Sequence, residues 1–200
     1  MDLRIRNEKM AWKAVTAAQE PKIMLHSGAE LDFLNPSASQ FTIEDIAHGL
    51  SMLCRYAGQC REFYSVAEHC LLVSDVVPEH AYAALMHDAA EAFVGDITRP
   101  LKQMLPQFKR VEHLVEEAIA TRFGVPRPMP GEVKQADLAV LAAEQEQLMP
   151  AGTNDWAAAA GIKPAPIRVR SLSPHDAKQA FLARFAELKP RHIRPRIAVV

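Results

Sequence analysis

The segment Leu85–Asp96 places several ionisable side chains within an otherwise apolar part of the chain. His87 and Asp88 are adjacent there, and Glu91 follows one turn later. In a helix, this spacing would bring Glu91 onto the face shared by the pair. Burying such groups together is costly unless something compensates their charge. A divalent cation is the simplest compensator, because imidazole nitrogen and carboxylate oxygen are both good ligands.

Two ligands do not complete a metal site, and two other segments offer the rest. His69 lies in the middle of an apolar segment, and Asp137 introduces a carboxylate into the apolar part of a later one. Each residue taken alone is more simply explained as a hydrogen-bonded or solvent-facing side chain. The order of a His, an adjacent His-Asp pair and a distant Asp, each on a separate predicted helix, favours a shared cation.

Hydrophobic periodicity and stop signals predict the helices that must position these residues. Thr42 and Asp45 have the spacing of a helix N-cap and a first-turn acid, and Gly58 is expected to end that helix. Pro78, Gly95 and Gly124 are the further stop signals. The remaining predicted helices span residues 65–77, 79–93, 108–123, 132–148 and 173–188, with a turn at 157–160.

We therefore expect an all-α fold of five to six core helices in a single domain. A loop-rich N-terminal arm covers residues 1–41 and has room for a short β-hairpin across His26-Ser27-Gly28. The metal-binding helical core covers residues 42–149. A C-terminal extension with one helix covers residues 150–200.

The composition narrows the classes of function. The chain has 200 residues, of which 49% are hydrophobic, so it can bury a substantial core. A formal net charge of -1 argues against wholesale binding of nucleic acid or an anionic membrane. The sequence has no run of about 18 apolar residues, no secretory signal and no CxxC pair among its cysteines. These features predict a cytoplasmic protein with reduced thiols.

The order H…HD…D resembles the HD-domain metal-dependent phosphohydrolase superfamily, and the surrounding residues resemble its bacterial 5′-deoxynucleotidase-like branch. Five blocks between about Ile43 and Leu148 carry the resemblance: Arg55-Tyr56, Ser65-Val66-Ala67-Glu68-His69, His87-Asp88-Ala89-Ala90-Glu91 with Gly95-Asp96, Pro100-Leu101-Lys102, and Lys134-Gln135-Ala136-Asp137. The branch has Trp where this chain has Tyr56, so the choice between deoxyribose and ribose stays open.

The resemblance implies a role for each matched residue. Four side chains would be ligands of one divalent metal ion: His69, His87, Asp88 and Asp137. Two carboxylates would orient and deprotonate the attacking water or serve the leaving group: Glu91 and Asp96. Three side chains would contact the substrate: Arg55, Tyr56 and Lys102. Mixed nitrogen and oxygen ligands do not choose among Mg²⁺, Mn²⁺, Co²⁺, Fe²⁺, Ni²⁺ and Zn²⁺.

Three functions follow from this resemblance. The favoured one is hydrolysis of the phosphomonoester of a (deoxy)nucleoside 5′-monophosphate by a metal-activated water. A second is a phosphohydrolase or phosphodiesterase that acts on another nucleotide or signalling nucleotide. A third is a non-catalytic HD module that binds a nucleotide or a protein. The expected partner is a small phosphate ester rather than nucleic acid or membrane, and the two terminal segments are candidates for a homodimer interface.

Three further residues near the predicted site have more than one interpretation. Glu68 is either a hydrogen-bond partner of a metal ligand or a solvated helix residue. Lys134 is either part of the site or a surface charge. Trp156 is expected to be a packing group rather than a platform for a base.

Overall fold

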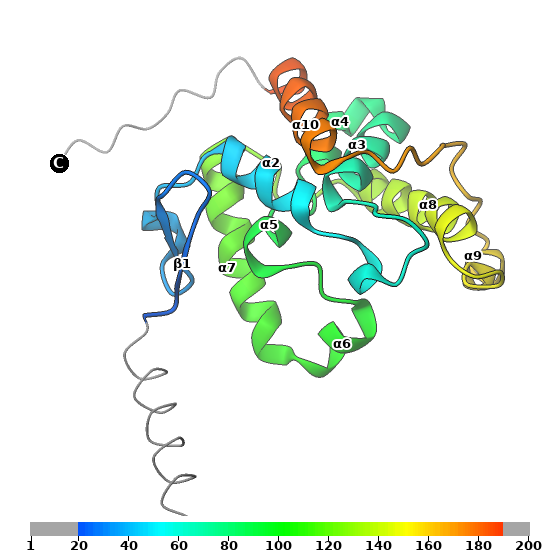
Figure 1. Cartoon of the computed structure of the whole chain (residues 1–200), viewed down its shortest axis with the longest axis horizontal. Coiled ribbons are helices and arrows are strands. Elements are labelled where there is room, and N and C mark those ends of the chain that lie inside the picture. The colour runs from blue at the N-terminus through cyan, green and yellow to red at the C-terminus, as the bar shows by residue number, and fades with distance from the viewer. Residues whose placement is uncertain (1–19, 190–200) are drawn as a thin grey trace, which may run out of the picture.

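The computed structural model describes residues 20–189, which form a group of helices with one small hairpin (Figure 1). The predicted all-α fold with a short N-terminal hairpin is confirmed. Residues 1–19 of the expected N-terminal arm and residues 190–200 of the expected C-terminal extension lie outside the described residues.

The elements follow one another along the chain in this order. They are β1 (Lys22–Met24), β2 (Glu30–Asp32), η1 (Pro36–Ala38), α2 (Ile43–Met52), η2 (Tyr56–Gly58), α3 (Val66–Val76), η3 (Pro78–His80), α4 (Ala81–Leu85), α5 (Glu91–Val94), α6 (Arg99–Met104), α7 (Pro106–Phe123), α8 (Gly131–Leu148), α9 (Asp155–Ala159) and α10 (Pro174–Leu188).

Four of the predicted helices are confirmed within two residues at each end: α3, α7, α8 and α10. Capping residues explain the agreement for α3, α7 and α10. The Ser65 hydroxyl accepts a hydrogen bond from the backbone amide of Glu68 at the start of α3, and Ser173 does the same for Asp176 at the start of α10. Gly124 ends α7 in the left-handed conformation, with a φ of 66°.

The hairpin is fastened to the first described helix by one carboxylate. Strands β1 and β2 pair antiparallel, with Ile23 opposite Leu31. Asp45 accepts hydrogen bonds from the backbone amide and the hydroxyl of Ser27 in the hairpin turn, at 2.8 and 3.0 Å. The same side chain accepts from the backbone amide of Thr42, which completes the predicted N-cap as a capping box.

Helix α2 ends at Met52 and not near Gly58, so the predicted end is wrong. The helix ends there because the backbone of the next residues pairs with the backbone just before α3. Cys54 and Ser65 form an isolated antiparallel bridge, and the backbone amide of Arg55 donates to the carbonyl of Tyr64 at 2.8 Å. The residues between them therefore form a loop, which carries η2 at its tip.

The single helix predicted over residues 79–93 is also wrong. The structure divides this stretch into η3, α4 and α5, with turns over residues 86–90. Nearly every side chain in this stretch is buried or half-buried, so the pattern of apolar residues has no exposed face that could reveal the break. The break matters because adjacent residues of a continuous helix point about 100° apart. Turns free His87 and Asp88 from that constraint.

Helix α3 is the centre of the described part of the molecule. Every residue from Val66 to Ser74 is buried, and the helix contacts α2, α4, α8 and α10. Helix α10 lies across α3 and α4 (Figure 1), and its Phe181 is fully buried. The last described helix thus packs into the same core as the helices that precede it.

Helices α2 and α5 touch through their backbones. A Cβ atom on Gly49 of α2 would lie 2.6 Å from the carbonyl oxygen of Ala92 in α5. That separation is shorter than atoms tolerate, so only glycine permits this approach. Since α5 begins with Glu91, the contact helps to fix where that residue stands.

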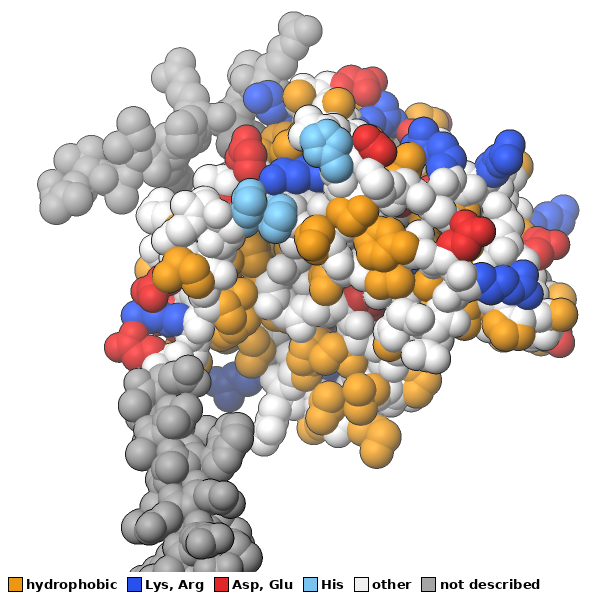
Figure 2. All heavy atoms as spheres, viewed as in Figure 1, with side chains coloured by type: hydrophobic (Ala, Val, Ile, Leu, Met, Phe, Trp, Pro, Cys, Tyr) orange, Lys and Arg blue, Asp and Glu red, His pale blue; other side chains and the backbone are white. Residues whose placement is uncertain are grey.

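Helix α6 occupies a stretch for which no helix was predicted from the sequence. Pro100 lies in its first turn, a position that favours helix initiation. Leu101 and Met104 of this helix are exposed, and so is Leu105, which follows it. Figure 2 shows hydrophobic side chains gathered over α6, whereas charged side chains of both signs are interspersed over much of the rest of this face. Among residues 20–189, no helix combines the length and the apolar character needed to cross a bilayer.

Candidate metal centre

Two imidazoles and two carboxylates converge in the interior of the protein. His69 Nε2 lies 3.5 Å from Asp88 Oδ2 and 3.3 Å from Asp137 Oδ1. His87 Nε2 lies 3.2 Å from Asp88 Oδ2 and 4.0 Å from Asp137 Oδ1. Donor atoms that share one cation at about 2.1 Å stand roughly 3 to 4 Å apart. The ligand atoms of His69, His87 and Asp88 all lie within 4.8 Å of one another, a spacing that fits a single ion, and Asp137 adds a carboxylate oxygen within 4.0 Å of both imidazoles.

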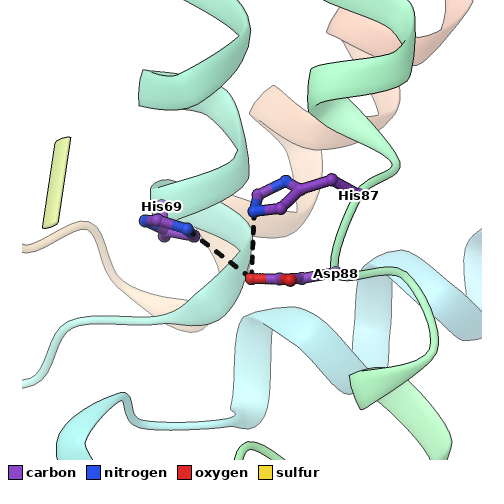
Figure 3. Close-up of side chains that lie close together, drawn as sticks. All are labelled: His69, His87 and Asp88. Carbon is purple, nitrogen blue, oxygen red and sulfur yellow. Dashed lines mark ion pairs between the residues drawn. The ribbon is translucent and has the colours of Figure 1, made fainter. Parts of the chain in front are cut away.

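Three separate parts of the fold deliver these side chains. His69 comes from the middle of α3, His87 and Asp88 come from the turns between α4 and α5, and Asp137 comes from α8. Figure 3 shows both imidazoles turned toward the carboxylate of Asp88. The structure thus brings together the four residues predicted as ligands. Their coordination of a metal stays a prediction.

The second nitrogen of each imidazole is already engaged. His87 Nδ1 donates to the carbonyl oxygen of Ala84 at 2.7 Å, and His69 Nδ1 lies 2.6 Å from Glu144 Oε1. A proton on each Nδ1 leaves each Nε2 with a lone pair. Both Nε2 atoms are buried and have no hydrogen-bond partner among residues 20–189. Such an arrangement fits a cation, which would supply the missing partner for both lone pairs.

The local charges point the same way. Burial opposes the protonation of His87, but Asp88 beside it raises the pKa of the imidazole well above its ordinary value. Burial likewise opposes ionisation of Asp88 and Asp137, yet the neighbouring imidazoles lower the pKa of both carboxyls. The cluster is therefore a place that favours positive charge, whether as protons or as a metal ion.

Glu144 is a site residue that the sequence analysis missed. This fully buried carboxylate of α8 contacts His69, and its Oε1 also accepts from the hydroxyl of Tyr64 at 2.6 Å. Its Oε2 accepts from Tyr56 at 2.9 Å and lies 3.1 Å from Arg55 Nη2. Burial opposes its ionisation, but Arg55 and His69 lower the pKa of Glu144 to about 2.

Arg55 and Tyr56, predicted to contact substrate, are held beside the cluster by these bonds. Arg55 is buried, its Nη1 lies 3.9 Å from Asp88 Oδ2, and its Nε has no partner within the described chain. Tyr56 and Ala57 have φ values of 59° and 51°, a left-handed conformation that costs about 1–2 kcal/mol per residue. The backbone of the loop is therefore strained at Tyr56 and Ala57, directly after Arg55.

A cavity of about 520 Å³ opens beside the cluster. Its lining includes the predicted substrate contacts Arg55, Tyr56 and Lys102 and the predicted catalytic carboxylates Glu91 and Asp96. Asp88 and Asp137 form the part of its wall that adjoins the cluster. Every residue assigned from the sequence to catalysis or substrate binding thus lies around one space. A smaller cavity of about 260 Å³ reaches His87, Asp88 and Asp137 from another side.

Glu91 is the carboxylate most suited to proton transfer in this cavity. Its Oε1 lies 3.7 Å from Lys102 Nζ, while its buried Oε2 has no partner among the described residues. Burial, followed by the charges of Asp88 and Asp96, raises the pKa of Glu91. Burial also raises the pKa of Asp96, against the opposing influence of Arg55. A carboxyl with a raised pKa can act as a general acid or base near neutral pH.

Of the three ambiguous residues, Glu68 matches neither interpretation. It is fully buried, and its two oxygens accept from the backbone amides of Arg170 and Leu172, each at 2.7 Å. Its function is to anchor the segment that leads into α10. Lys134 is exposed and donates to Asp137 Oδ2 at 2.5 Å. Trp156 lines the large cavity.

The fold and this cluster define a class of protein: an all-helical domain with a buried histidine–carboxylate centre between α3, α8 and the turns before α5. No protein-family model matches the chain. It is 40% identical over 168 residues to the uncharacterized protein YfdR of Escherichia coli strain K12, a match that covers 83% of this chain and 94% of YfdR.

A second relative comes from Rhodobacter capsulatus. The chain is 36% identical over 179 residues to its uncharacterized protein RCAP_rcc00048, covering 79% of this chain and 90% of that protein. The chain therefore belongs to the family that includes YfdR and RCAP_rcc00048.

Proposed function

We propose that the protein is a divalent-metal-dependent phosphohydrolase of the HD-domain type, and that its substrate is a (deoxy)nucleoside 5′-monophosphate. One observation carries the proposal above the others. Two buried imidazole Nε2 atoms without hydrogen-bond partners face two carboxylates at distances of 3.2 to 4.0 Å. Two imidazoles and two carboxylates are ligands suited to one divalent cation. They would leave coordination positions for a water and a phosphate oxygen.

The residues around the cavity divide the work of hydrolysis. The bound cation would supply charge neutralisation for the phosphate and a water acidic enough to attack at neutral pH. Arg55 and Lys102 both line the cavity and would neutralise the phosphate oxygens of a bound substrate. Glu91 would hold or move a proton at its uncontacted Oε2, and Asp96 would assist from the same wall.

Localisation and assembly belong to the same proposal. The three cysteines are free thiols, which suits a cytoplasmic protein. The partner we propose is a small phosphate ester, and the metal is one ion of Mg²⁺, Mn²⁺, Co²⁺, Fe²⁺, Ni²⁺ or Zn²⁺. A homodimer stays a prediction.

The test is turnover of a panel of phosphate esters by the purified protein, with added Mn²⁺, Co²⁺ or Mg²⁺. We expect release of phosphate from nucleoside 5′-monophosphates, loss of metal binding in His87→Ala, and retention of metal binding in Glu91→Gln. Removing the general acid or base should reduce the turnover number by about 100-fold or more in Glu91→Gln. The matched control is Glu146→Gln, which alters an exposed glutamate of α8.

Each outcome decides between the alternatives. Turnover of cyclic or signalling nucleotides in place of monophosphates would replace the substrate but keep the phosphohydrolase. Tight nucleotide binding without turnover under any of the metals would reject the enzyme in favour of a binding module.

A further inference from the structure

One wall of the large cavity is a regular stripe along α8. Asp137, Leu141 and Gln145 follow one another at intervals of four residues, and all three line the cavity. Residues four apart lie on the same face of a helix. From the first to the third, the stripe extends about 12 Å along the helix axis. The cavity therefore reaches well beyond the cluster and the groups proposed to bind phosphate.

The far end of this stripe meets an indole ring. Trp156 belongs to α9, lines the same cavity and is half-buried. Its Nε1 donates to Gln145 Oε1 at 2.7 Å, which ties the ring to the end of the stripe. This bond holds the ring at its edge and so occupies neither ring face, which is the surface that stacks against a planar group.

The side-chain amide of Gln145 also has a nitrogen, Nε2, that can donate a hydrogen bond. Its oxygen is occupied by the indole, whereas its nitrogen makes no hydrogen bond to any described residue. A side-chain amide nitrogen is a donor only. The donor lies next to an apolar surface formed by Leu141 and Trp156.

The cavity is consequently different at its two ends. Near the cluster it presents the cations of Arg55 and Lys102, and along the stripe it presents a leucine, an indole and one amide donor. A ligand that fits both ends carries an anionic phosphate at one end and a planar heteroaromatic ring with a hydrogen-bond acceptor at the other.

We propose that Leu141, Gln145 and Trp156 form the binding site for the base of the nucleotide, with the indole stacking on the base and Gln145 donating to a ring nitrogen or carbonyl oxygen. This assignment rests on the proposed function, because it names where the leaving nucleoside lies. It assigns Trp156 a specificity-determining role in place of the packing role expected from the sequence.

Stacking on the base has a measurable size. Alanine in place of a stacking aromatic residue weakens binding of a base by roughly 5- to 150-fold. We expect Trp156→Ala to weaken nucleoside monophosphate binding within that range, and Trp156→Phe to retain most of the affinity. Because ribose 5-phosphate has no base, the preference for the nucleotide over ribose 5-phosphate should fall in Trp156→Ala.

Direct binding separates this site from the chemistry. The chain has two tryptophans, so the Trp12→Phe protein reports Trp156 alone by fluorescence. It is titrated with a nucleoside, a nucleoside monophosphate and ribose 5-phosphate in the presence of a chelator, which prevents turnover. We expect the first two to quench the fluorescence and ribose 5-phosphate to leave it unchanged. Affinities of Trp156→Ala, Trp156→Phe and the control Phe63→Ala, an exposed aromatic outside the cavity lining, are measured by calorimetry.

The two proposals fail in different ways. Quenching by nucleosides without hydrolysis of any ester would reject the phosphohydrolase and keep the base site. Nucleotide turnover with equal preference in Trp156→Ala and wild type would reject the base site and keep the phosphohydrolase. Folding of each variant is checked by thermal unfolding, and Trp156→Phe provides the conservative substitution if Trp156→Ala does not fold.

Discussion

Glu144 links two groups of residues that have separate proposed tasks. Its Oε1 contacts His69 and Tyr64, and its Oε2 contacts Tyr56 and Arg55. One carboxylate therefore sets which nitrogen of an expected metal ligand carries the proton and also orients an expected phosphate-binding guanidinium. Partners of this kind typically affect metal affinity nearly as strongly as the ligands do.

We predict that Glu144→Gln weakens metal binding by about 10- to 100-fold, because a neutral amide oxygen accepts from His69 Nδ1 more weakly than a carboxylate does. Titration calorimetry with Mn²⁺ measures the change, on protein shown to be folded by circular dichroism. Glu146→Gln, two residues along α8 and exposed, is the matched control. Equal affinities for Glu144→Gln and wild type would show that His69 does not depend on this contact.

Individual residues of the site differ in how far the sequence revealed them. His87 and Asp88 were detectable because adjacent ionisable groups in an apolar stretch need compensation. Glu144 was not, because a lone glutamate in a helix usually faces solvent. The available signal was its position seven residues after Asp137, which puts both carboxylates on one face of α8.

Short elements were harder to predict than long ones. Three of the four confirmed helices have a clear end signal, which is Ser65 for α3, Gly124 for α7 and Ser173 for α10. Helices α7, α8 and α10 also keep an exposed face, so their pattern is visible in the sequence. The stretch over residues 79–93 has neither, since burial on several sides makes a broken chain look like one helix. The end of α2 was missed because pairing between Cys54 and Ser65 is a contact across a loop.

The hairpin and α2 should separate at low pH through Asp45. Burial alone would raise the pKa of Asp45, but hydrogen bonds from Thr42 and Ser27 lower it below its ordinary value. A group whose pKa is lowered on folding stabilises the protein above its unfolded pKa of about 3.9, and loses that effect as pH falls through the folded pKa.

We predict that Asp45→Asn lowers the free energy of unfolding by about 1 kcal/mol at neutral pH, as loss of a capping carboxylate does. Urea denaturation across a pH series measures the difference from wild type, which should shrink below roughly pH 4. Glu44→Gln changes the adjacent exposed acid and serves as control. A difference that stays constant down to pH 3 would contradict this account.

Across the described molecule, α3 contributes to both of the buried apolar clusters. The candidate metal site lies on this shared helix and draws its other side chains from the α4–α5 turns and α8. A cation bound there would connect parts of the chain that are distant in sequence. Its binding free energy would therefore add to the stability of the whole fold.

We predict that saturating Mn²⁺ raises the melting temperature by about 5–10 °C relative to protein with a chelator, which corresponds to about 2.7 kcal/mol at 100 times the dissociation constant. Differential scanning calorimetry measures the shift. His87→Ala should abolish it. If that variant shows the same shift as wild type, the ion acts elsewhere on the protein.

The contact between Gly49 and Ala92 limits how this protein can be made more robust. Replacing a helical glycine by alanine ordinarily strengthens the helix by up to about 1 kcal/mol, and such exchanges are standard in thermostability engineering. At Gly49 the added methyl group would strike the carbonyl of Ala92 and push α5 outward. A library selected only for heat resistance should therefore avoid this position, since Glu91 would move with its helix.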